Sequence, residues 1–168
     1  MLVSEGQIAA RVAELGQALA RDYAQANPVL VGVLQGAVPF VADLMRGLPI
    51  DLTVDFLRAS SYGSGTSSSG TVRLVADLAV DIADRHVLLV DDIVDTGHTL
   101  AALKRELEAR RPRSVRTCVL LDKTGRRQIE VTIDYVGFTI PNVFVVGYGL
   151  DYDGLYRNLP YVAMLDGI

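Results

Sequence analysis

Three carboxylates follow a short apolar run near the middle of the chain. The apolar residues Val87–Val90 predict a buried strand, and Asp91, Asp92 and Asp95 come directly or closely after it. Open α/β sheets bind ligands at the carboxyl ends of their strands, so these side chains would face a ligand. Crowded carboxylates repel one another, which costs stability unless a ligand or a cation relieves the repulsion. The cluster therefore predicts a functional site.

The turn after these carboxylates has the composition of a phosphate site. Gly97 lets the backbone approach a ligand closely, and Thr96 and Thr99 add hydroxyl donors. A helix is expected to begin at this point, because leucines recur at heptad-like spacing over residues 100–107. The free amides and the positive end of the macrodipole at a helix start favour an anion, most simply a phosphate.

Other interpretations of this segment fit less well. A Walker A loop needs a lysine after its second glycine, and a dinucleotide fingerprint needs Gly-x-Gly-x-x-Gly; the segment has neither. The spacing of Asp91, Asp92 and Asp95 differs from the Asp-x-Asp-x-Thr of metal-dependent phosphatases. A simple capped helix after a strand would explain Thr99 but not the three carboxylates.

The elements around the site are those of an α/β protein. Residues 4–24 have apolar side chains at helical spacing, and Ser4 with Gln7 predicts a capping box. A further helix is expected over Pro39–Arg46. Strands are expected at Val29–Leu34, Asp51–Leu57, Val87–Val90, Val115–Leu121, Val131–Thr139, Val143–Tyr148 and Tyr161–Leu165. The alternation predicts one domain over residues 1–168, with a mainly parallel twisted sheet and helices on both faces.

One segment of low complexity, Ser60–Gly70, is rich in serine and glycine, which is typical of a flexible loop. Strand-like runs on both sides place it within the domain and not between two domains. Long loops inside compact domains are often active-site lids, so we expect a flexible lid at about residues 59–71.

The composition argues against several classes of protein. The net charge is −4 and the basic residues are scattered, whereas a nucleic-acid binder would usually have a basic face. No run approaches the ~20 apolar residues that span a bilayer. The N-terminal region contains Glu5 and Glu14 and lacks the apolar core of a signal peptide, so we expect a cytoplasmic protein. Cys118 lies in an apolar run and is expected to be buried and not nucleophilic.

The run Val90–Thr99 is similar to a known signature. Its order is an apolar residue, two acids, two apolar residues, Asp-Thr-Gly, any residue and Thr. This order resembles the phosphoribosyl-pyrophosphate signature of type I phosphoribosyltransferases. Four further segments resemble the hypoxanthine-guanine branch of that family: Leu34–Gly36, Ser61–Tyr62, Leu121–Arg127 and Phe144–Asp151. The likeness covers the chain from about residue 29 onward and implies the type I phosphoribosyltransferase fold, with a small hood formed by the chain termini.

The resemblance implies roles for the signature residues. Asp91 and Asp92 would lie near the ribose hydroxyls, directly or through Mg²⁺. The 5′-phosphate would be bound by Asp95, Thr96, Gly97, His98 and Thr99. Asp95 would also lie near purine N7 and accept a proton as the glycosidic bond forms, although a loop cap is the alternative. His98 has no implied catalytic role and is expected to be a solvent-facing loop residue.

The resemblance also implies a purine site. Lys123 would donate to the 6-oxygen of the base, and a solvated surface lysine is the alternative. An adenine presents an amino donor at that position, so Lys123 favours a 6-oxopurine. Phe144 would stack on the purine, unless it is a core residue. Val145 would present its backbone to the base edge, and Asp151 would line the same site.

The remaining implied residues serve pyrophosphate, metal and lid. The pyrophosphate would be bound by Gln35, Gly36, Arg127 and Arg157. The family often has lysine or arginine in place of Gln35, but backbone amides beside Gly36 can bind the anion without that charge. Asp151 would join Asp91 and Asp92 as a Mg²⁺ ligand. Ser61 and Tyr62 would supply contacts from the closed lid.

The implied activity is purine salvage. The phosphoribosyl group of phosphoribosyl pyrophosphate would be transferred to hypoxanthine or guanine, giving IMP or GMP and pyrophosphate. Positioning, Mg²⁺ and exclusion of water would stabilise an oxocarbenium-like transition state. Two alternatives remain: a xanthine-preferring enzyme, and a non-catalytic nucleotide-sensing regulator, which the net charge of −4 disfavours. The family suggests a homodimer or a homotetramer.

Overall fold

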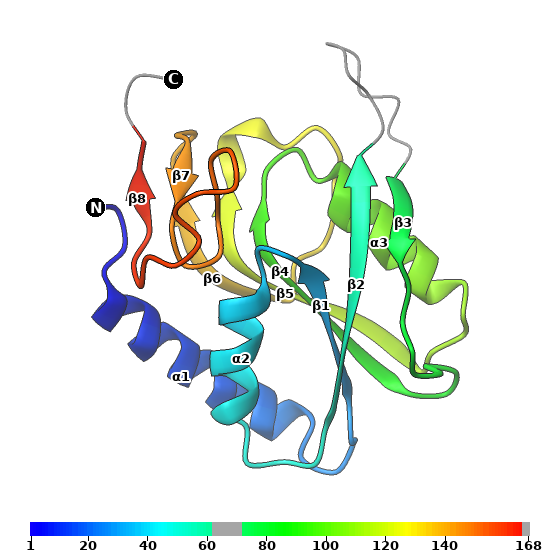
Figure 1. The fold of residues 1–168 in the computed structure, drawn as a ribbon. Coiled ribbons are helices and arrows are strands. Elements are labelled where there is room, and N and C mark those ends of the chain that lie inside the picture. The colour runs from blue at the N-terminus through cyan, green and yellow to red at the C-terminus, as the bar shows by residue number, and fades with distance from the viewer. Residues whose placement is uncertain (62–71, 166–168) are drawn as a thin grey trace.

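The computed structural model describes residues 1–61 and 72–165 (Figure 1). Its helices are α1 (Glu5–Asp22), α2 (Val38–Arg46), α3 (His98–Glu108) and the short 3₁₀ helix η1 (Thr124–Arg126). Its strands are β1 (Val29–Leu34), β2 (Thr53–Ser61), β3 (Val72–Ala76), β4 (His86–Val94), β5 (Ser114–Lys123), β6 (Tyr135–Ile140), β7 (Val145–Val146) and β8 (Ala163–Met164).

The central sheet has the strand order β3-β2-β1-β4-β5-β6. Neighbouring strands are parallel, except for β2 and β3, which are antiparallel. The chain proceeds from β1 to β2 on one side and returns to β4 on the other side of β1, so the order reverses between β1 and β4. Sheets of this kind bind ligands at the carboxyl ends of the strands beside such a reversal. The expected mainly parallel α/β fold is confirmed.

Helices cover both faces of the sheet, as predicted (Figure 1). Helices α1 and α2 contribute to one apolar cluster and α3 contributes to the other. The apolar residues that predicted α1 are all buried: Ile8, Val12, Leu15 and Leu19. The capping box is present, since the Ser4 side chain accepts from the Gln7 amide and the Gln7 side chain accepts from the Ser4 amide. Cys118 is buried, which raises the pKa of its thiol to about 12 and confirms its structural role.

A small second sheet joins the two ends of the described chain. Strands β7 and β8 pair in antiparallel fashion, and Val3 pairs with Val162 beside them. Figure 1 shows β7 and β8 next to the N-terminal segment. This is the hood that the family resemblance implied.

Three predicted strands are shorter than the sequence indicated. Residues 131–134 lie outside β6. The Thr117 amide of β5 donates to the Asp134 side chain at 2.8 Å instead of to a backbone carbonyl of a neighbouring strand. Residues 147–150 form a turn, in which the Gly147 amide donates to Leu150 at 3.0 Å, so β7 ends at Val146. Of residues 161–165, only Ala163 and Met164 belong to β8. Apolar runs therefore predicted strands where side chains and turns satisfy the backbone instead.

The expected lid lies mainly outside the described residues. Ser61 is the last residue of β2, and Tyr62 falls in the part of the chain that is not described. The described backbone on either side is an antiparallel pair in which Ser61 is opposite Val72. Within the described residues, the helices are too short or too polar to cross a membrane.

Candidate active site

The predicted site residues lie where parallel strands end, at the carboxyl edge of the sheet. Gln35 and Gly36 follow β1, and Asp91 and Asp92 lie near the end of the adjacent strand β4. Lys123 is the last residue of β5, which is next to β4. Strands that are neighbours in the sheet thus bring together three segments that are far apart in sequence.

The first loop approaches the acidic pair very closely. A Cβ atom placed on Gly36 would lie 1.6 Å from Oδ2 of Asp92, so any other residue would force the loop or the Asp92 side chain to shift. The peptide bond between Leu34 and Gln35 is cis, and the Gln35 side chain is exposed. The missing side chain of Gly36 is therefore what allows the β1 loop to contact the β4 carboxylates.

The acidic pair is held by its own backbone. The Asp92 amide donates to Oδ1 of Asp91 at 3.0 Å, and the Ile93 amide donates to Oδ1 of Asp92 at 2.8 Å. Asp91 is only 7% exposed, and burial raises its pKa well above the ordinary value, while the charge of Asp92 raises it further. Burial also raises the pKa of Asp92. The repulsion expected from the sequence is thus present in the fold.

A small cavity lies over the predicted phosphate loop. It has a volume of about 110 Å³ and is lined by Asp91, Ile93, Val94, Asp95, Thr96, Gly97, Thr99 and Leu100. Gly97 has a φ of 91° at the start of α3, a conformation that favours glycine. His98 begins α3, and its Nε2 lies 3.2 Å from Oε1 of Gln128. His98 is therefore the first residue of a helix and not a loop residue; it is half-buried and does not line this cavity.

A second cavity adjoins the first. Its volume is about 250 Å³, and its lining consists of Asp92, Ile93, Asp95, Lys123, Phe144, Val145, Leu150 and Asp151. Phe144 is 44% exposed and packs edge-to-face on Tyr152, with ring centroids 5.7 Å apart. Lys123 is only 7% exposed. The alternatives of a core phenylalanine and a solvated lysine are therefore wrong, and every predicted purine residue lines one cavity.

Asp95 lies where the two cavities meet. Its Oδ2 is 3.4 Å from the Arg126 guanidinium and 3.9 Å from Nζ of Lys123. Its Oδ1 is buried and has no hydrogen-bond partner among the described residues. A buried acceptor of this kind costs free energy unless it is paired with a donor.

The two predicted pyrophosphate arginines are both paired with carboxylates. Arg127 forms an ion pair with Asp122. Arg157 lies 2.7 Å from Oδ1 of Asp151 and also donates to the Gly149 carbonyl. Arg157 therefore lies beside the second cavity, whereas Arg127 is held by the strand residue that precedes Lys123.

The carboxylates fit a magnesium ion that arrives with a substrate. Within the described residues, no three His, Cys, Asp or Glu side chains are grouped as a metal cage. Asp92 and Asp151 nevertheless line the same cavity. Magnesium is commonly bound by one or two protein carboxylates together with water and substrate phosphates, and this donor set suits that arrangement.

Several site residues carried no role in the sequence analysis. Ile93 and Leu150 form apolar parts of the second cavity, and Arg126 pairs with Asp95. Asp122 binds Arg127. The apolar position in the signature could have indicated Ile93, but nothing in the spacing shows that Arg126, and not Arg127, contacts Asp95.

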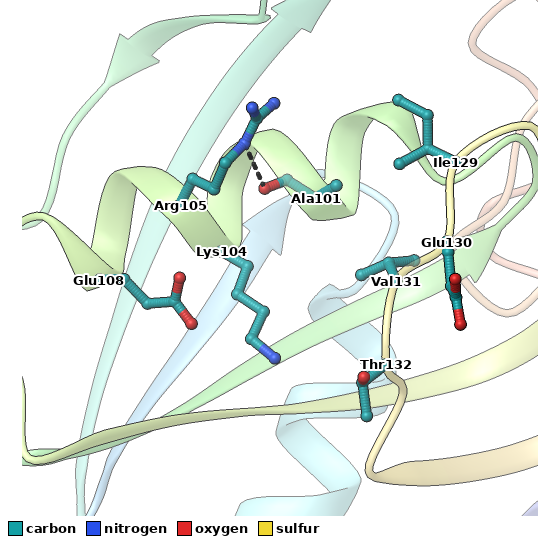
Figure 2. Close-up of a pocket in the computed structure, with 8 residues that line it drawn as sticks. All are labelled: Ala101, Lys104, Arg105, Glu108, Ile129, Glu130, Val131 and Thr132. Atoms are coloured by element: carbon teal, nitrogen blue, oxygen red, sulfur yellow. Dashed lines mark hydrogen bonds between the residues drawn. The ribbon is translucent and has the colours of Figure 1, made fainter.

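A further cavity lies away from these residues, between α3 and residues 129–132 (Figure 2). Its volume is about 430 Å³, and its lining is Ala101, Lys104, Arg105, Glu108, Ile129, Glu130, Val131 and Thr132. Figure 2 shows Arg105 bonded to the Ala101 carbonyl of its own helix. Because this cavity contains none of the signature carboxylates, we do not assign the chemistry to it.

Comparison with known proteins agrees with this geometry. The phosphoribosyl transferase domain matches residues 1–153. A hypoxanthine-guanine phosphoribosyltransferase of Mycobacterium tuberculosis is 51% identical over 99% of this chain and 85% of its own. The crystal structure of one from Bacillus anthracis, with HEPES in its active site, has a TM-score of 0.94 at 43% identity, covering 98% of this chain and 97% of that chain.

Some relatives are much longer. The bifunctional protein TilS/HprT of Listeria monocytogenes is 47% identical over 98% of this chain, but the chain spans only 26% of that protein. The domain match, the identities and the shared fold all point the same way. This chain belongs to the phosphoribosyltransferase family, in its hypoxanthine-guanine branch.

Proposed function

We propose that this chain is a purine-salvage enzyme. It transfers the phosphoribosyl group of phosphoribosyl pyrophosphate to hypoxanthine or guanine, giving IMP or GMP and pyrophosphate. One observation carries the proposal: a cavity over a phosphate loop and a cavity with an aromatic side chain and a lysine meet at Asp95. A 5′-phosphate in the first and a base in the second would place the ribose between them.

The side chains of the second cavity suit a 6-oxopurine. Phe144 presents its ring for stacking, and the buried ammonium of Lys123 can donate to a carbonyl oxygen. The free oxygen of Asp95 can accept a proton from a ring nitrogen as that base becomes bonded to ribose. An adenine would place an amino donor against Lys123, which has no acceptor.

The other predicted residues complete the proposal. Asp91 and Asp92 would accept from ribose hydroxyls. Asp92 and Asp151 would hold Mg²⁺, which would neutralise the pyrophosphate charge when bound with the substrate. The backbone amides of Gln35 and Gly36, in the loop after β1, would bind the pyrophosphate. These assignments rest on the positions of the side chains around the two cavities.

The first experiment is an assay with phosphoribosyl pyrophosphate and Mg²⁺ against hypoxanthine, guanine, xanthine and adenine in separate reactions. We expect turnover of hypoxanthine and guanine and none of adenine. Preferred turnover of xanthine would replace the proposal with its nearest alternative. Binding of phosphoribosyl pyrophosphate without turnover of any base would favour the regulator, which a salt-sensitive RNA shift would then support.

A variant pair tests the base assignment. Lys123→Met should lower kcat/KM for hypoxanthine roughly 10- to 100-fold, because a charged donor to the carbonyl is lost. Lys104→Met changes a lysine on the far side of α3 and should leave kcat/KM unchanged. Equal kcat/KM values for Lys123→Met and the unmodified enzyme would show that Lys123 does not contact the base.

Four expectations about the whole protein stay proposals. They are a single domain, a lid at about residues 59–71 carrying Ser61 and Tyr62, a homodimer or homotetramer, and a cytoplasmic location. Sedimentation would settle the oligomeric state. Protection of the lid from proteolysis on addition of substrates would test its closure.

A further inference from the structure

Asp122, near the end of β5, forms an ion pair with Arg127, the residue that follows η1, and the implied chemistry gives this pairing no role. Asp122 and Arg127 pair through Oδ1 and a guanidinium nitrogen, and their side chains are only 14% and 21% exposed. In the sheet, Asp122 is opposite Val94, the residue that precedes Asp95. The pair is therefore shielded from solvent and lies directly beside the phosphate loop.

The arginine of this pair packs against the phosphate loop. Cδ of Arg127 lies 3.0 Å from the position of a Cβ atom on Gly97, so its stem, together with the Ile129 carbonyl oxygen at 2.7 Å, fills the space that glycine leaves. Its Nε is buried and without a hydrogen-bond partner among the described residues, so the bond to Asp122 is what anchors the guanidinium. This arginine therefore supports the 5′-phosphate loop from outside.

The residues that follow Arg127 fasten the same loop. The amides of Gln128 and Ile129 donate to the Thr96 carbonyl at 2.9 and 3.1 Å. Displacement of Arg127 would therefore disturb both the contact at Gly97 and the backbone bonds at Thr96. The ion pair acts on two adjacent residues of the phosphate cavity.

We propose that Asp122 is a positioning residue for 5′-phosphate binding: it holds Arg127 against Gly97 and so fixes the loop that receives the phosphate. The inference rests on the proposed function and deepens it. It moves Arg127 from the pyrophosphate to the opposite end of the substrate. Because Asp122 acts through Arg127 and does not touch the ligand, its loss should change affinity for the phosphate more than the rate of the chemical step.

Equilibrium binding tests this role without turnover. Calorimetric titration of Asp122→Asn with ribose 5-phosphate and with GMP should give Kd values about tenfold higher than those of the unmodified protein, as for other residues that orient a binding group. The inhibition constant of inorganic pyrophosphate, measured in competition with phosphoribosyl pyrophosphate, should be the same for Asp122→Asn and the unmodified protein. Steady-state assays should show a higher KM for phosphoribosyl pyrophosphate, with kcat and the KM for the base nearly unchanged.

Three further variants separate positioning from folding. Asp122→Glu keeps the carboxylate and should recover much of the affinity. Asp134→Asn removes a carboxylate that binds Thr117 of the same strand, and it should lower stability without changing the Kd of ribose 5-phosphate. If Asp122→Asn does not fold, Asp122→Asn/Arg127→Gln leaves no unpaired charge and should show the same weakened binding.

The possible results are distinct. Unchanged or tighter binding of ribose 5-phosphate by Asp122→Asn, or a change confined to pyrophosphate, would overturn the inference. An equal loss of affinity in Asp134→Asn would also overturn it, since the effect would then be general. Weakened ribose 5-phosphate binding in a protein that turns over no purine would support the inference while refuting the proposed function.

Discussion

Polar side chains are arranged differently at the two edges of the central sheet, where the parallel strands begin (the amino edge) and where they end (the carboxyl edge). At the amino edge, Asp22 accepts from Tyr135 and pairs with Arg116, and Asp134 accepts from both the amide and the hydroxyl of Thr117. At the carboxyl edge, two aspartates stand side by side with raised pKa values. The carboxylates named at the first edge are thus paired with donors, whereas Asp91 and Asp92 are buried beside each other at the second. The other aspartates of the carboxyl edge, Asp95, Asp122 and Asp151, are paired with basic side chains.

Buried atoms without partners show the same contrast. Among the described residues three such side-chain atoms are found, and two of them, Oδ1 of Asp95 and Nε of Arg127, lie at the carboxyl edge. The third is the hydroxyl of Tyr23, which lies beneath Arg116 at the amino edge. Because native proteins rarely leave such atoms unpaired, the unpaired oxygen of Asp95, which lines both cavities, is consistent with a ligand site there.

The largest effect is expected from the unpaired carboxylate. Asp95→Asn removes the proton acceptor while keeping the shape of the side chain, so kcat should fall on the order of 100-fold or more. Asp134→Asn at the amino edge should keep kcat and lower the melting temperature. Steady-state kinetics and thermal melts of both variants provide the measurement. A small decrease in kcat for Asp95→Asn would mean that Asp95 only caps the loop and does not accept the proton.

Close approach at Gly36 should matter almost as much. Gly36→Ala places a methyl group 1.6 Å from Oδ2 of Asp92, so either the first loop or the Asp92 side chain must move, and turnover should fall at least tenfold. Gly6→Ala is the matched change on the exposed face of α1, where a Cβ atom would meet nothing within 4 Å. It should stabilise the protein by about 0.5–1 kcal/mol through helix propensity. An active Gly36→Ala enzyme would contradict the contact between the β1 loop and Asp92.

The sequence predicted the helices and strands that position the site better than it predicted where the later strands begin and end. Periodicity indicated α1 and its capping box, and continuous apolar runs indicated β1, β4 and β5, because burial dictates both patterns. The signature then placed Asp91, Asp92 and Asp95 at the correct edge. The strand expected from residue 131 failed because the Asp134 side chain replaces the ladder there, a contact between residues 17 positions apart in sequence.

The pairings within the site could not be read from the sequence. Arg126 and Arg127 are adjacent and chemically identical, yet one contacts Asp95 and the other contacts Asp122. That choice depends on the 3₁₀ turn at η1, which the sequence analysis did not predict. Phe144 likewise had the neighbours of a core residue, yet it precedes β7 and is 44% exposed.

Removing the repulsion between Asp91 and Asp92 should stabilise the protein. Asp91→Asn keeps an acceptor for the Asp92 amide and replaces a buried charge by an amide that can donate to Asp92. The unfolding free energy at neutral pH should rise by about 1 kcal/mol, or roughly 2–4 °C in Tm, while turnover falls. Thermal melts of the ligand-free protein measure the change. A lower Tm would mean that the two carboxylates already support each other.

The smallest effect is expected from an exposed ion pair outside the site, Asp77 with Arg110 at 2.8 Å. The hydrogen bond from Arg110 lowers the pKa of Asp77, so the pair stabilises the folded state above the ordinary pKa of an aspartate, and that contribution is lost as the pH falls through the lowered pKa. Asp77→Asn should cost at most about 0.5 kcal/mol at pH 7, because solvent screens a half-exposed pair. Urea unfolding of both proteins from pH 7 down to pH 3 should show the difference shrinking below about pH 4. A difference that stays constant with pH would show that the effect does not come from the charge of Asp77, since the Leu78 amide can still donate to the side-chain oxygen of an asparagine.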